Sequence, residues 1–311
     1  MTDSEPGATV IIPTLNREGF LLDTLQDLAA QDSHPLEIMV VDQSEETRTS
    51  NRAEEFARRF PGLVKYCRVK FRGLPQARNH GWQNAKYQAL IFVDDDIRCG
   101  PTFVREHLRT LRQPGVGMVA GGVEERTSVS NSAASNSAAE PGEFLFWTAT
   151  PVRRFAARGE HAVMHVAGCN FSVWRSVLEQ AGGVDEALSQ GAALYEETEL
   201  GLQVMACGFR IRFNGSARLL HRVAEQGGCR SGDIASYVGS LAHNRTVLIG
   251  RYLRWFQMPT AYLRLFLLVA SYAARHPSGR LLGDALRGIL RGRRVSQRPR
   301  ICTDYRRAEK A

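Results

Sequence analysis

The sequence lacks the features of a secreted or membrane-spanning protein. Residues 1–7 are polar and acidic, without the basic segment and apolar core of a secretory signal. The longest apolar run near the C-terminal end, residues 265–274, is roughly half as long as a membrane-spanning helix. We therefore expect a cytoplasmic protein with no transmembrane helix.

Cysteine motifs are also missing. The six cysteines are scattered, and no two of them form a Cys-x-x-Cys pair. This spacing disfavours a structural zinc site, and without a secretory signal we expect reduced thiols. The cysteines are Cys67, Cys99, Cys169, Cys207, Cys229 and Cys302.

A glycine-rich phosphate loop of the Walker type is absent. Residues 115–120 match the dinucleotide pattern Gly-x-Gly-x-x-Ala, but no strand-like segment precedes them and a strand-like segment follows. Because the pattern lacks the context that gives it a function, we reject it. Residues 13–16, Pro-Thr-Leu-Asn, stand where a nucleotidyltransferase would carry its phosphate loop, which disfavours that class of enzyme.

Charge is distributed unevenly along the 311 residues, whose net charge is +8. Residues 226–311 hold 16 arginines and lysines against 4 acidic residues, whereas residues 1–225 hold 24 against 28. A basic tail suits nucleic acid, anionic lipid or a phosphorylated acceptor. Its arginines accompany an apolar helical stripe of Tyr262, Leu265, Phe266, Val269 and Tyr272. That pattern favours a membrane surface or a helical cap on the rest of the chain over nucleic acid.

Strand and helix patterns alternate over the first hundred residues. Short apolar runs at 9–13, 36–41, 63–70 and 89–93 read as strands, and segments near 21–28, 54–60 and 74–88 read as helices. This alternation predicts an α/β fold with a mostly parallel sheet covered by helices. Ligands of such sheets bind beyond the carboxyl ends of the strands, where this chain carries polar residues. They are Thr14, Asn16, Asp42, Ser44, Asp94, Asp95 and Asp96.

The three consecutive aspartates after the run 89–93 are the most informative of these residues. Adjacent carboxylates repel one another unless a cation or solvent relieves the repulsion. Mg²⁺ and Mn²⁺ take hard oxygen ligands, often one or two carboxylates together with substrate phosphates. The alternative is a solvated turn, which aspartate also favours.

Beyond residue 100 the patterns are less regular. Residues 127–142 are rich in Ser, Ala and Asn and predict a mobile loop, either a lid over a substrate or a tolerated insertion. We expect strand character at 118–123, helices at 173–181 and 197–207, and a short strand at 210–214. From residue 231 onward the chain reads as helical.

At this point the residues carry a family pattern. The blocks are VIIPTLNRE from Val10, VVDQS from Val40, GLPQARNHG from Gly73, ALIFVDDD from Ala89, GCNFSVWR from Gly168, GGVDEAL from Gly182, YEETELGLQVMACGFRI from Tyr195 and the single His221. In their order and spacing, over about two thirds of the chain, they resemble the family 2 glycosyltransferases. The resemblance implies a GT-A type nucleotide-binding fold, with a mixed, mostly parallel sheet, flanking helices and here a C-terminal helical extension.

The resemblance also implies an activity and its residues. It implies inverting transfer of a sugar, of the hexosyl type, from a nucleoside-diphosphate sugar to a hydroxyl acceptor, with Mn²⁺ or Mg²⁺. The implied donor-binding residues are Pro13, Thr14, Asn16, Glu18, Asp42, Ser44, Gly73, Arg78, Asn79, Asp94 and Asp95. The implied metal ligands are Asp94, Asp96 and His221, with Asp96 the main one. Trp147, Gly168 and Asn170 are expected on the acceptor side.

The proton acceptor of such a transfer is a carboxylate at the start of a helix. The family pattern places it at Glu197, with Glu196 in reserve, although relatives usually carry Asp at this position. Gln43 likewise stands where many relatives carry a second acid beside Asp42. We expect Glu199 to face solvent or cap the helix. The alternative is that all three acids merely favour a helix N-terminus.

The resulting organisation has two parts. Residues 1–225 are expected to form the catalytic domain, with a donor half over about 1–100 and an acceptor half over about 101–225. Residues 226–311 are expected to form the basic helical extension. The acceptor stays open between a saccharide, a lipid-linked saccharide and a natural product, and no nucleic acid is expected. Two alternatives remain: a non-catalytic binding protein of the same fold, and an interaction protein that sits on the inner face of a membrane through its basic tail.

Overall fold

The first third of the chain alternates strands and helices, as predicted. The computed structural model describes residues 7–45, 47–125, 140–189, 191, 193–223 and 233–298. The elements are β1 (Ala8–Thr14), α1 (Glu18–Ala29), β2 (Leu36–Asp42), α2 (Thr47–Arg59), β3 (Val64–Arg68), α3 (Leu74–Asn84) and β4 (Ala89–Val93). The four strands lie in the order β3-β2-β1-β4, and all neighbours are parallel.

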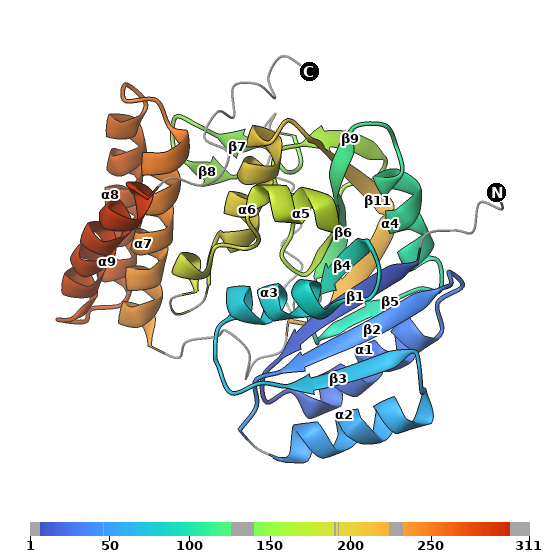
Figure 1. Ribbon diagram of the computed structural model, residues 1–311. Coiled ribbons are helices and arrows are strands. Elements are labelled where there is room, and N and C mark those ends of the chain that lie inside the picture. Colours follow the sequence, from blue (N-terminus) through green and yellow to red (C-terminus); the bar gives the residue numbers. More distant parts are fainter. Residues whose placement is uncertain are drawn as a thin grey trace.

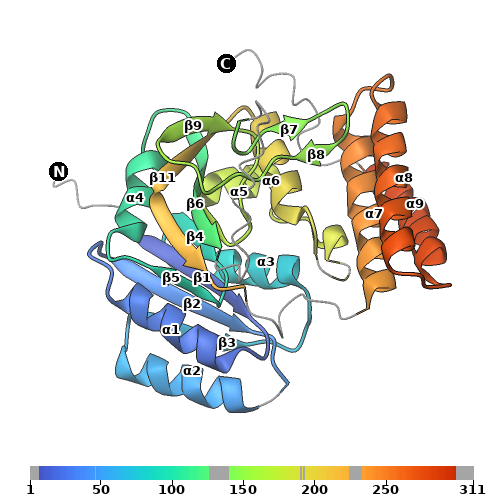
Figure 2. The same cartoon turned by 180° about the vertical axis from the view of Figure 1, so that it is seen from behind.

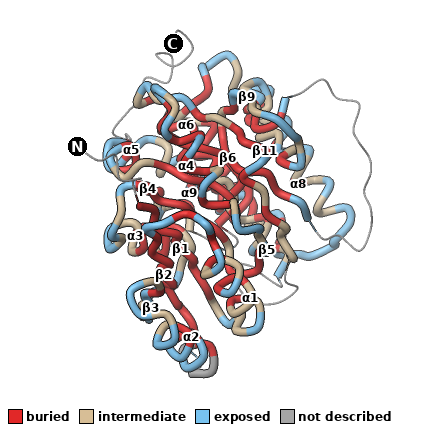
Figure 3. Tube along the Cα trace, turned by 90° about the vertical axis from the view of Figure 1, so that its right-hand side faces the viewer, coloured by how far each residue is buried: buried red, intermediate tan, exposed pale blue. Residues whose placement is uncertain are grey.

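These strands form the centre of the core. Every residue of β1, β2 and β4 is buried, which is why each reads as a short continuous apolar run. Helix α3 covers one face of the parallel strands, and α1 and α2 cover the other (Figures 1 and 2). Figure 3 shows the buried chain running through β1, β2, β4 and β6. The carboxyl ends of β1, β2 and β4 therefore meet at one edge of the sheet.

The second part of the chain extends this sheet with mixed directions. Its elements are β5 (Ile97–Cys99), α4 (Phe103–Leu111), β6 (Val116–Glu125), β9 (Glu160–Val163), β10 (Asn170–Trp174), α5 (Arg175–Ala181), α6 (Glu196–Ala206) and β11 (Arg210–His221). A short 3-10 helix, η1, covers Glu186–Leu188. β10 is antiparallel to β4 and β6, whereas β11 is parallel to β6 and antiparallel to β5 and β9. The result is the expected mixed sheet, here with nine strands.

Among the differences from the sequence expectation, two concern β11 and α4. The short strand expected at 210–214 extends to His221, because a register shift between Asn214 and Arg218 lets β11 continue pairing with β6 past Gly215. Helix α4 was not expected at all.

Cys207 takes part in a disulfide, so the expectation of reduced thiols is wrong at that residue. Cys67, Cys99 and Cys169 are free, as expected.

Three helices follow: α7 (Ile234–Tyr252), α8 (Met258–Arg275) and α9 (Leu281–Ser296). The Asp233 carboxylate caps α7 by accepting hydrogen bonds from the backbone N–H groups of Ala235 and Ser236. The apolar cluster of the three helices includes Phe144 and Leu202, which belong to the preceding part of the chain. The helices therefore pack onto that part. The division at residue 225 stays a prediction.

Helices α7 and α9 approach closely because glycine lines their contact. A side chain at Gly288 would collide with the carbonyl oxygen of Gly239, and one at Gly292 with that of His243. Among the described residues, no helix combines the length and the apolar character needed to cross a membrane. The small hairpin of β7 (Phe144–Leu145) and β8 (Thr150–Pro151) lies beside α7. Residues 127–139 of the predicted loop, like 224–232 and 299–311, lie outside the described residues.

Candidate active site

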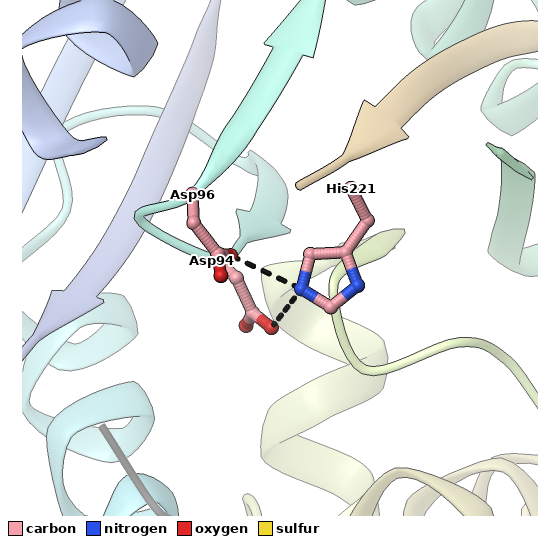
Figure 4. Close-up of side chains that lie close together, drawn as sticks. All are labelled: Asp94, Asp96 and His221. Carbon is pink, nitrogen blue, oxygen red and sulfur yellow. Dashed lines mark ion pairs between the residues drawn. The ribbon is translucent and has the colours of Figure 1, made fainter. Parts of the chain in front are cut away.

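The acidic turn after β4 and the end of β11 form one cluster. The register that pairs His221 with Ile97 brings the imidazole beside the acidic turn. The His221 Nε2 atom lies 3.0 Å from Oδ1 of Asp96 and 3.7 Å from Oδ2 of Asp94. Figure 4 shows the three side chains pointing toward one another. The chain therefore brings together the three residues predicted as metal ligands.

This donor set fits a divalent cation of the Mg²⁺ or Mn²⁺ type. One ligand atom from each of Asp94, Asp96 and His221 lies within 4.8 Å of the other two. Two hard carboxylate oxygens with one imidazole nitrogen suit Mn²⁺. Burial lowers the pKa of His221, but the hydrogen bond to Asp96 and the charges of Asp94 and Asp96 outweigh it, so the pKa lies above 6.5. A metal ion would replace the proton that this acidic surrounding otherwise favours on the imidazole.

Asp95, the middle residue of the turn, has a different environment. Its carboxylate accepts hydrogen bonds from the Thr14 hydroxyl at 2.7 Å and from Arg17 at 3.1 Å. Burial raises the pKa of Asp95 to about 7, although the positive charge of Arg17 opposes the shift. The Thr24 hydroxyl, on α1, donates to the Asp95 carbonyl oxygen at 2.9 Å and holds the turn against that helix. Asp95 thus connects the turn to β1 and α1, and its predicted role toward the donor stays a prediction.

Arg78, on α3, links the acidic turn to the start of α6. Its side chain is 1% exposed, forms a close ion pair with Glu196 and lies 3.8 Å from Asp94. It also donates a hydrogen bond to the Gly168 carbonyl oxygen at 2.7 Å. The guanidinium lies over the ring of Phe171, 5.5 Å from its centroid. A fixed positive charge therefore stands directly beside the candidate metal ligands.

The two candidate bases begin α6. Tyr195 precedes them in a left-handed conformation with φ of 66°, and the turn brings Glu196 and Glu197 inward, where both are buried. The carboxylate of Glu196 forms a close ion pair with Arg78, whereas that of Glu197 has Arg153 as its ion-pair partner, at 3.7 Å. The two acids thus have different surroundings. Glu197 is the less constrained of the two.

Glu199 differs from expectation. It is 0% exposed and accepts hydrogen bonds from Arg251 and from the Tyr252 hydroxyl, both at 2.8 Å. The expectation that it faces solvent or caps the helix is therefore wrong. Its partners lie on α7, more than fifty residues away in the chain, and they anchor α6 to that helix.

The polar residues after β1 and β2 form a linked loop structure. Both oxygens of Asp42 accept hydrogen bonds at 2.8 Å, one from the Ser44 backbone N–H and one from the Tyr66 hydroxyl. The Ser44 hydroxyl accepts from the backbone of Asn16 at 2.8 Å. Gln43, in the place of the second acid, accepts from the backbone N–H of Gly73 at 2.7 Å. Pro13 is the buried penultimate residue of β1, and Glu18 pairs with Arg52 at 2.9 Å.

Asn79 holds a turn in place. Its amide nitrogen donates to the Val184 carbonyl oxygen at 2.9 Å and to Glu186 at 2.8 Å. Its carbonyl oxygen accepts from the backbone N–H of Val184 at 2.9 Å and from Trp82 at 3.0 Å. The turn follows Gly182 and Gly183, both at positive φ. Every polar atom of Asn79 thus has a partner inside the protein, and a direct contact with the donor remains a prediction.

Asn170 lies within the sheet and joins three strands. Its amide nitrogen donates to the carbonyl oxygens of Gly122 on β6 and Ala217 on β11, at 2.8 and 2.9 Å. Its carbonyl oxygen lies 2.8 Å from Nε2 of His107, whose other nitrogen lies 3.0 Å from the Ser172 hydroxyl. Asn170 is completely buried in this network, and its acceptor-side role stays a prediction.

The network around His107 predicts acid sensitivity. Burial lowers the pKa of His107 from 6.5 to about 4. The unfolded chain therefore binds a proton that the folded chain excludes, and the contribution of this group to stability is complete above pH 6.5 and lost as the pH falls to 4. We expect about 2 kcal/mol of this contribution to disappear between pH 7 and pH 5. Urea unfolding of the wild type and of His107→Gln at both pH values measures it.

The control is His276→Gln, which removes an exposed histidine. It should keep the pH dependence of the wild type, while His107→Gln should flatten it. Equal slopes for all three proteins would contradict the assignment.

Trp147 lies away from the acidic turn, on the loop between β7 and β8. Its indole is 56% exposed and stands 5.8 Å from the ring of Phe256. The Thr260 hydroxyl at the start of α8 donates to its carbonyl oxygen at 2.6 Å. Trp147 therefore lies between the second part of the sheet and the C-terminal helices, and its acceptor-side role stays a prediction.

Sequence reasoning passed over two arginines of the site. Arg17, next to Asn16 in the first block, is the cation that contacts both Asp95 and Asp96, at 3.1 and 3.3 Å. Its place in that block was the available signal. Arg153, beside Glu197, follows a stretch without a recognisable motif, so only the folded chain reveals it.

Two solved structures with a similar fold are named as complexes that contain a nucleotide or nucleotide sugar together with Mn²⁺. The chain aligns with the mannosyltransferase PcManGT from Pyrobaculum calidifontis, solved with GDP-Man and Mn²⁺, at a TM-score of 0.57 and 16% identity, over 93% of this chain and 86% of that one. It aligns with GalNAc-T7, solved with UDP, GalNAc and Mn²⁺, at a TM-score of 0.60 and 17% identity, over 91% and 56%. The predicted GT-A fold is thereby confirmed.

The sequence comparison then identifies the family. Residues 9–182, 174 of the 311, match Glycosyl transferase family 2, and the chain belongs to that family. The curated relatives include the uncharacterized glycosyltransferase YfnE of Bacillus subtilis (strain 168), 33% identical over 104 residues. That alignment covers 33% of this chain and 26% of YfnE, so the chain spans about a quarter of the length of that relative.

Proposed function

We propose that the protein transfers a sugar, of the hexosyl type, from a nucleoside-diphosphate sugar to a hydroxyl acceptor with inversion. The observation that carries this proposal is the cluster of Asp94, Asp96 and His221, which stands beside the buried cation of Arg78. Family membership supports it, as do the GDP-Man and the UDP bound in the two solved structures of similar fold.

The residues divide the chemistry between them. Asp94, Asp96 and His221 would hold Mn²⁺ or Mg²⁺, which when bound stabilises negative charge on the departing diphosphate. Arg78 supplies a second, permanent positive charge, preorganised by Glu196 and the Gly168 carbonyl oxygen. The residues at the ends of β1 and β2, among them Thr14 and Asp42, would line the nucleotide.

Glu197 is the proposed general base. It takes the proton of the acceptor hydroxyl, whose oxygen forms the new bond to the anomeric carbon as the bond to the diphosphate oxygen breaks. The nucleoside diphosphate leaves on the opposite face, so the anomeric configuration inverts. Arg153, at 3.7 Å, is the ion-pair partner of the Glu197 carboxylate, which is the type of group that accepts a proton in such a step.

A nucleotide screen tests the proposal. Thermal unfolding is followed with guanosine, uridine and thymidine diphosphates, each with and without Mn²⁺. At 100 times its dissociation constant, the preferred nucleotide is expected to stabilise the protein by about 2.7 kcal/mol, and mostly with the metal present. Stabilisation by no nucleotide, with or without Mn²⁺, would contradict the proposal.

Turnover separates an enzyme from a non-catalytic binding protein of the same fold. With the matching nucleotide sugar, the enzyme should release nucleoside diphosphate, slowly by hydrolysis and faster once an acceptor is supplied. Binding without release under both conditions would favour the non-catalytic alternative. The cytoplasmic location and the domain limits of 1–225 and 226–311 remain predictions that accompany this proposal.

A further inference from the structure

The outward side of the C-terminal helices exposes an unusual number of large apolar side chains. Among the described residues, eleven large hydrophobic side chains are exposed, and eight of them lie between residues 255 and 290. Trp255 is 81% exposed, Phe266 66% and Leu282 60%. We call the eight the outer apolar face: Trp255, Phe256, Leu263, Phe266, Leu267, Leu282, Leu286 and Leu290. Concentrations of this kind mark binding surfaces.

The outer apolar face is not an unfinished part of the core. Helix α8 packs inward with Ala261, Leu265 and Val269, and the last two belong to the predicted apolar stripe. Phe266, also predicted in that stripe, lies instead on the exposed side. Helix α9 turns Leu281 and Ala285 inward, so both helices are apolar on two sides. Figures 1 and 2 show α8 and α9 side by side, on the side of α7 away from the sheet.

The apolar side chains follow helical spacing on each helix. Leu282, Leu286 and Leu290 lie four residues apart, which places them in one line along α9. Arg293 and Arg294 continue this line one turn further on, in the last turn of the helix. On α8, Leu263, Phe266 and Leu267 occupy adjacent turns in the same way.

The surroundings of this face are strongly basic. Residues 233–298 contain eleven arginines against Asp233 and Asp284 as the sole acidic residues, and no lysine. Arg280 pairs with both Asp233 and Asp284, and Arg287 pairs with Asp284. Seven further arginines are exposed and form no ion pair with any described carboxylate: Arg254, Arg264, Arg275, Arg291, Arg293, Arg294 and Arg298. The long apolar stems of such arginines can lie along an apolar surface while the guanidinium groups reach past it.

This combination decides between occupants. A second copy of the chain would bring two arginine-rich surfaces together, and the like charges would repel. Nucleic acid would leave the leucine and phenylalanine side chains exposed to water. An anionic bilayer takes both components, because its interior accepts the apolar side chains and its headgroups pair with the arginines.

We infer that the outer apolar face lies on the surface of an anionic phospholipid membrane, with α8 and α9 parallel to the bilayer plane. Neither helix enters the bilayer as a spanning segment. The contact of Phe256 with Trp147, and the bond from Thr260 to the same residue, connect the face to the β7–β8 hairpin. From there Arg245 reaches both Thr148 and, at 6.0 Å, the ring of Tyr195 at the start of α6. The outer apolar face is thus connected, through the hairpin and Arg245, to the start of α6, where Glu197 lies.

Vesicle flotation of the full chain tests this inference. The protein is mixed with vesicles of phosphatidylcholine alone, or of equal parts of phosphatidylcholine and phosphatidylglycerol, at low and at high salt. Binding is expected with the anionic vesicles, and it should weaken at high salt because the arginine contribution is screened. The double variant Arg293→Gln/Arg294→Gln should bind about 25-fold more weakly, at about fivefold per arginine.

Matched controls separate the surface from the rest of the protein. Arg58→Gln/Arg59→Gln removes two adjacent exposed arginines from the last turn of α2 and should bind as the wild type does. Leu286→Ser should weaken binding about tenfold, whereas Phe71→Ser, an exposed apolar residue in the N-terminal half, should not. All four positions are exposed, so the variants should fold, as their melting temperatures will show.

Three results would overturn the inference. One is the absence of binding to anionic vesicles at low salt. Another is equal weakening by the α2 and α9 arginine pairs. The third is a dimer in sedimentation that Leu286→Ser dissociates, since it would assign the face to a second copy. Flotation involves no turnover, so these results are independent of the proposed activity.

Discussion

Replacing Asp96 by alanine is expected to lower the rate of sugar transfer by about 10³-fold. The variant should also lose the Mn²⁺ dependence of nucleotide binding. Asp96 is 1% exposed and lies 3.0 Å from His221, at the centre of the candidate metal site. Its neighbour Asp95 cannot replace it, because Thr14 and Arg17 hold that carboxylate.

The measurement has two parts and a matched control. Titration calorimetry of the nucleoside diphosphate gives the affinity with and without Mn²⁺, and release of nucleoside diphosphate gives the rate. Asp32→Ala removes another carboxylate that pairs with one arginine, Arg105 at 2.7 Å, and it precedes β2, at the end of that strand opposite to the site. It should leave both quantities unchanged. An Asp96→Ala protein that transfers sugar at the wild-type rate would remove the basis of the proposed mechanism.

The first half of the fold could be predicted because its signals are local. β1, β2 and β4 are buried over their whole length, and each appears as an apolar run between polar residues. The range of β4 in the structure, Ala89–Val93, is the predicted one. Parallel pairing of neighbouring strands then requires that the polar residues at their carboxyl ends meet. The 2.7 Å bond between Thr14 and Asp95 is one result.

The failures have tertiary causes. The length of β11 depends on a register shift against β6, and nothing near Gly215 in the sequence announces that pairing. Glu199 resembles a surface residue of a helix N-terminus until Arg251 of α7 is placed beside it.

The site shows the same division. The family resemblance predicts the three candidate ligands from the sequence. The register between β5 and β11 brings them together in space. The sequence could not distinguish three adjacent aspartates, yet Asp95 is bound by Thr14 and Arg17, whereas the other two contact His221. Nor could it show that Arg78 spans from Asp94 to Glu196, since this contact joins segments more than a hundred residues apart.

The two acids at the start of α6 give the second large effect. Glu197→Gln is expected to lower kcat by about 10²- to 10⁴-fold while leaving donor affinity and stability nearly unchanged, because it removes only the proton acceptor. Glu196→Gln should do the reverse. It leaves the buried guanidinium of Arg78 without its close carboxylate partner, which should cost about 3 kcal/mol or more of stability. Turnover rates, nucleotide affinities and urea unfolding of the two variants measure this contrast.

A third variant distinguishes a base from a merely structural acid. Glu197→Asp keeps the carboxylate but shortens its reach by one methylene, and it restores the residue that the family pattern usually carries there. It should therefore recover much of the rate that Glu197→Gln loses, as a proton acceptor would. If instead Glu196→Gln lost turnover at full stability while Glu197→Gln stayed active, the base would be Glu196, and Arg78 would be the group that tunes it.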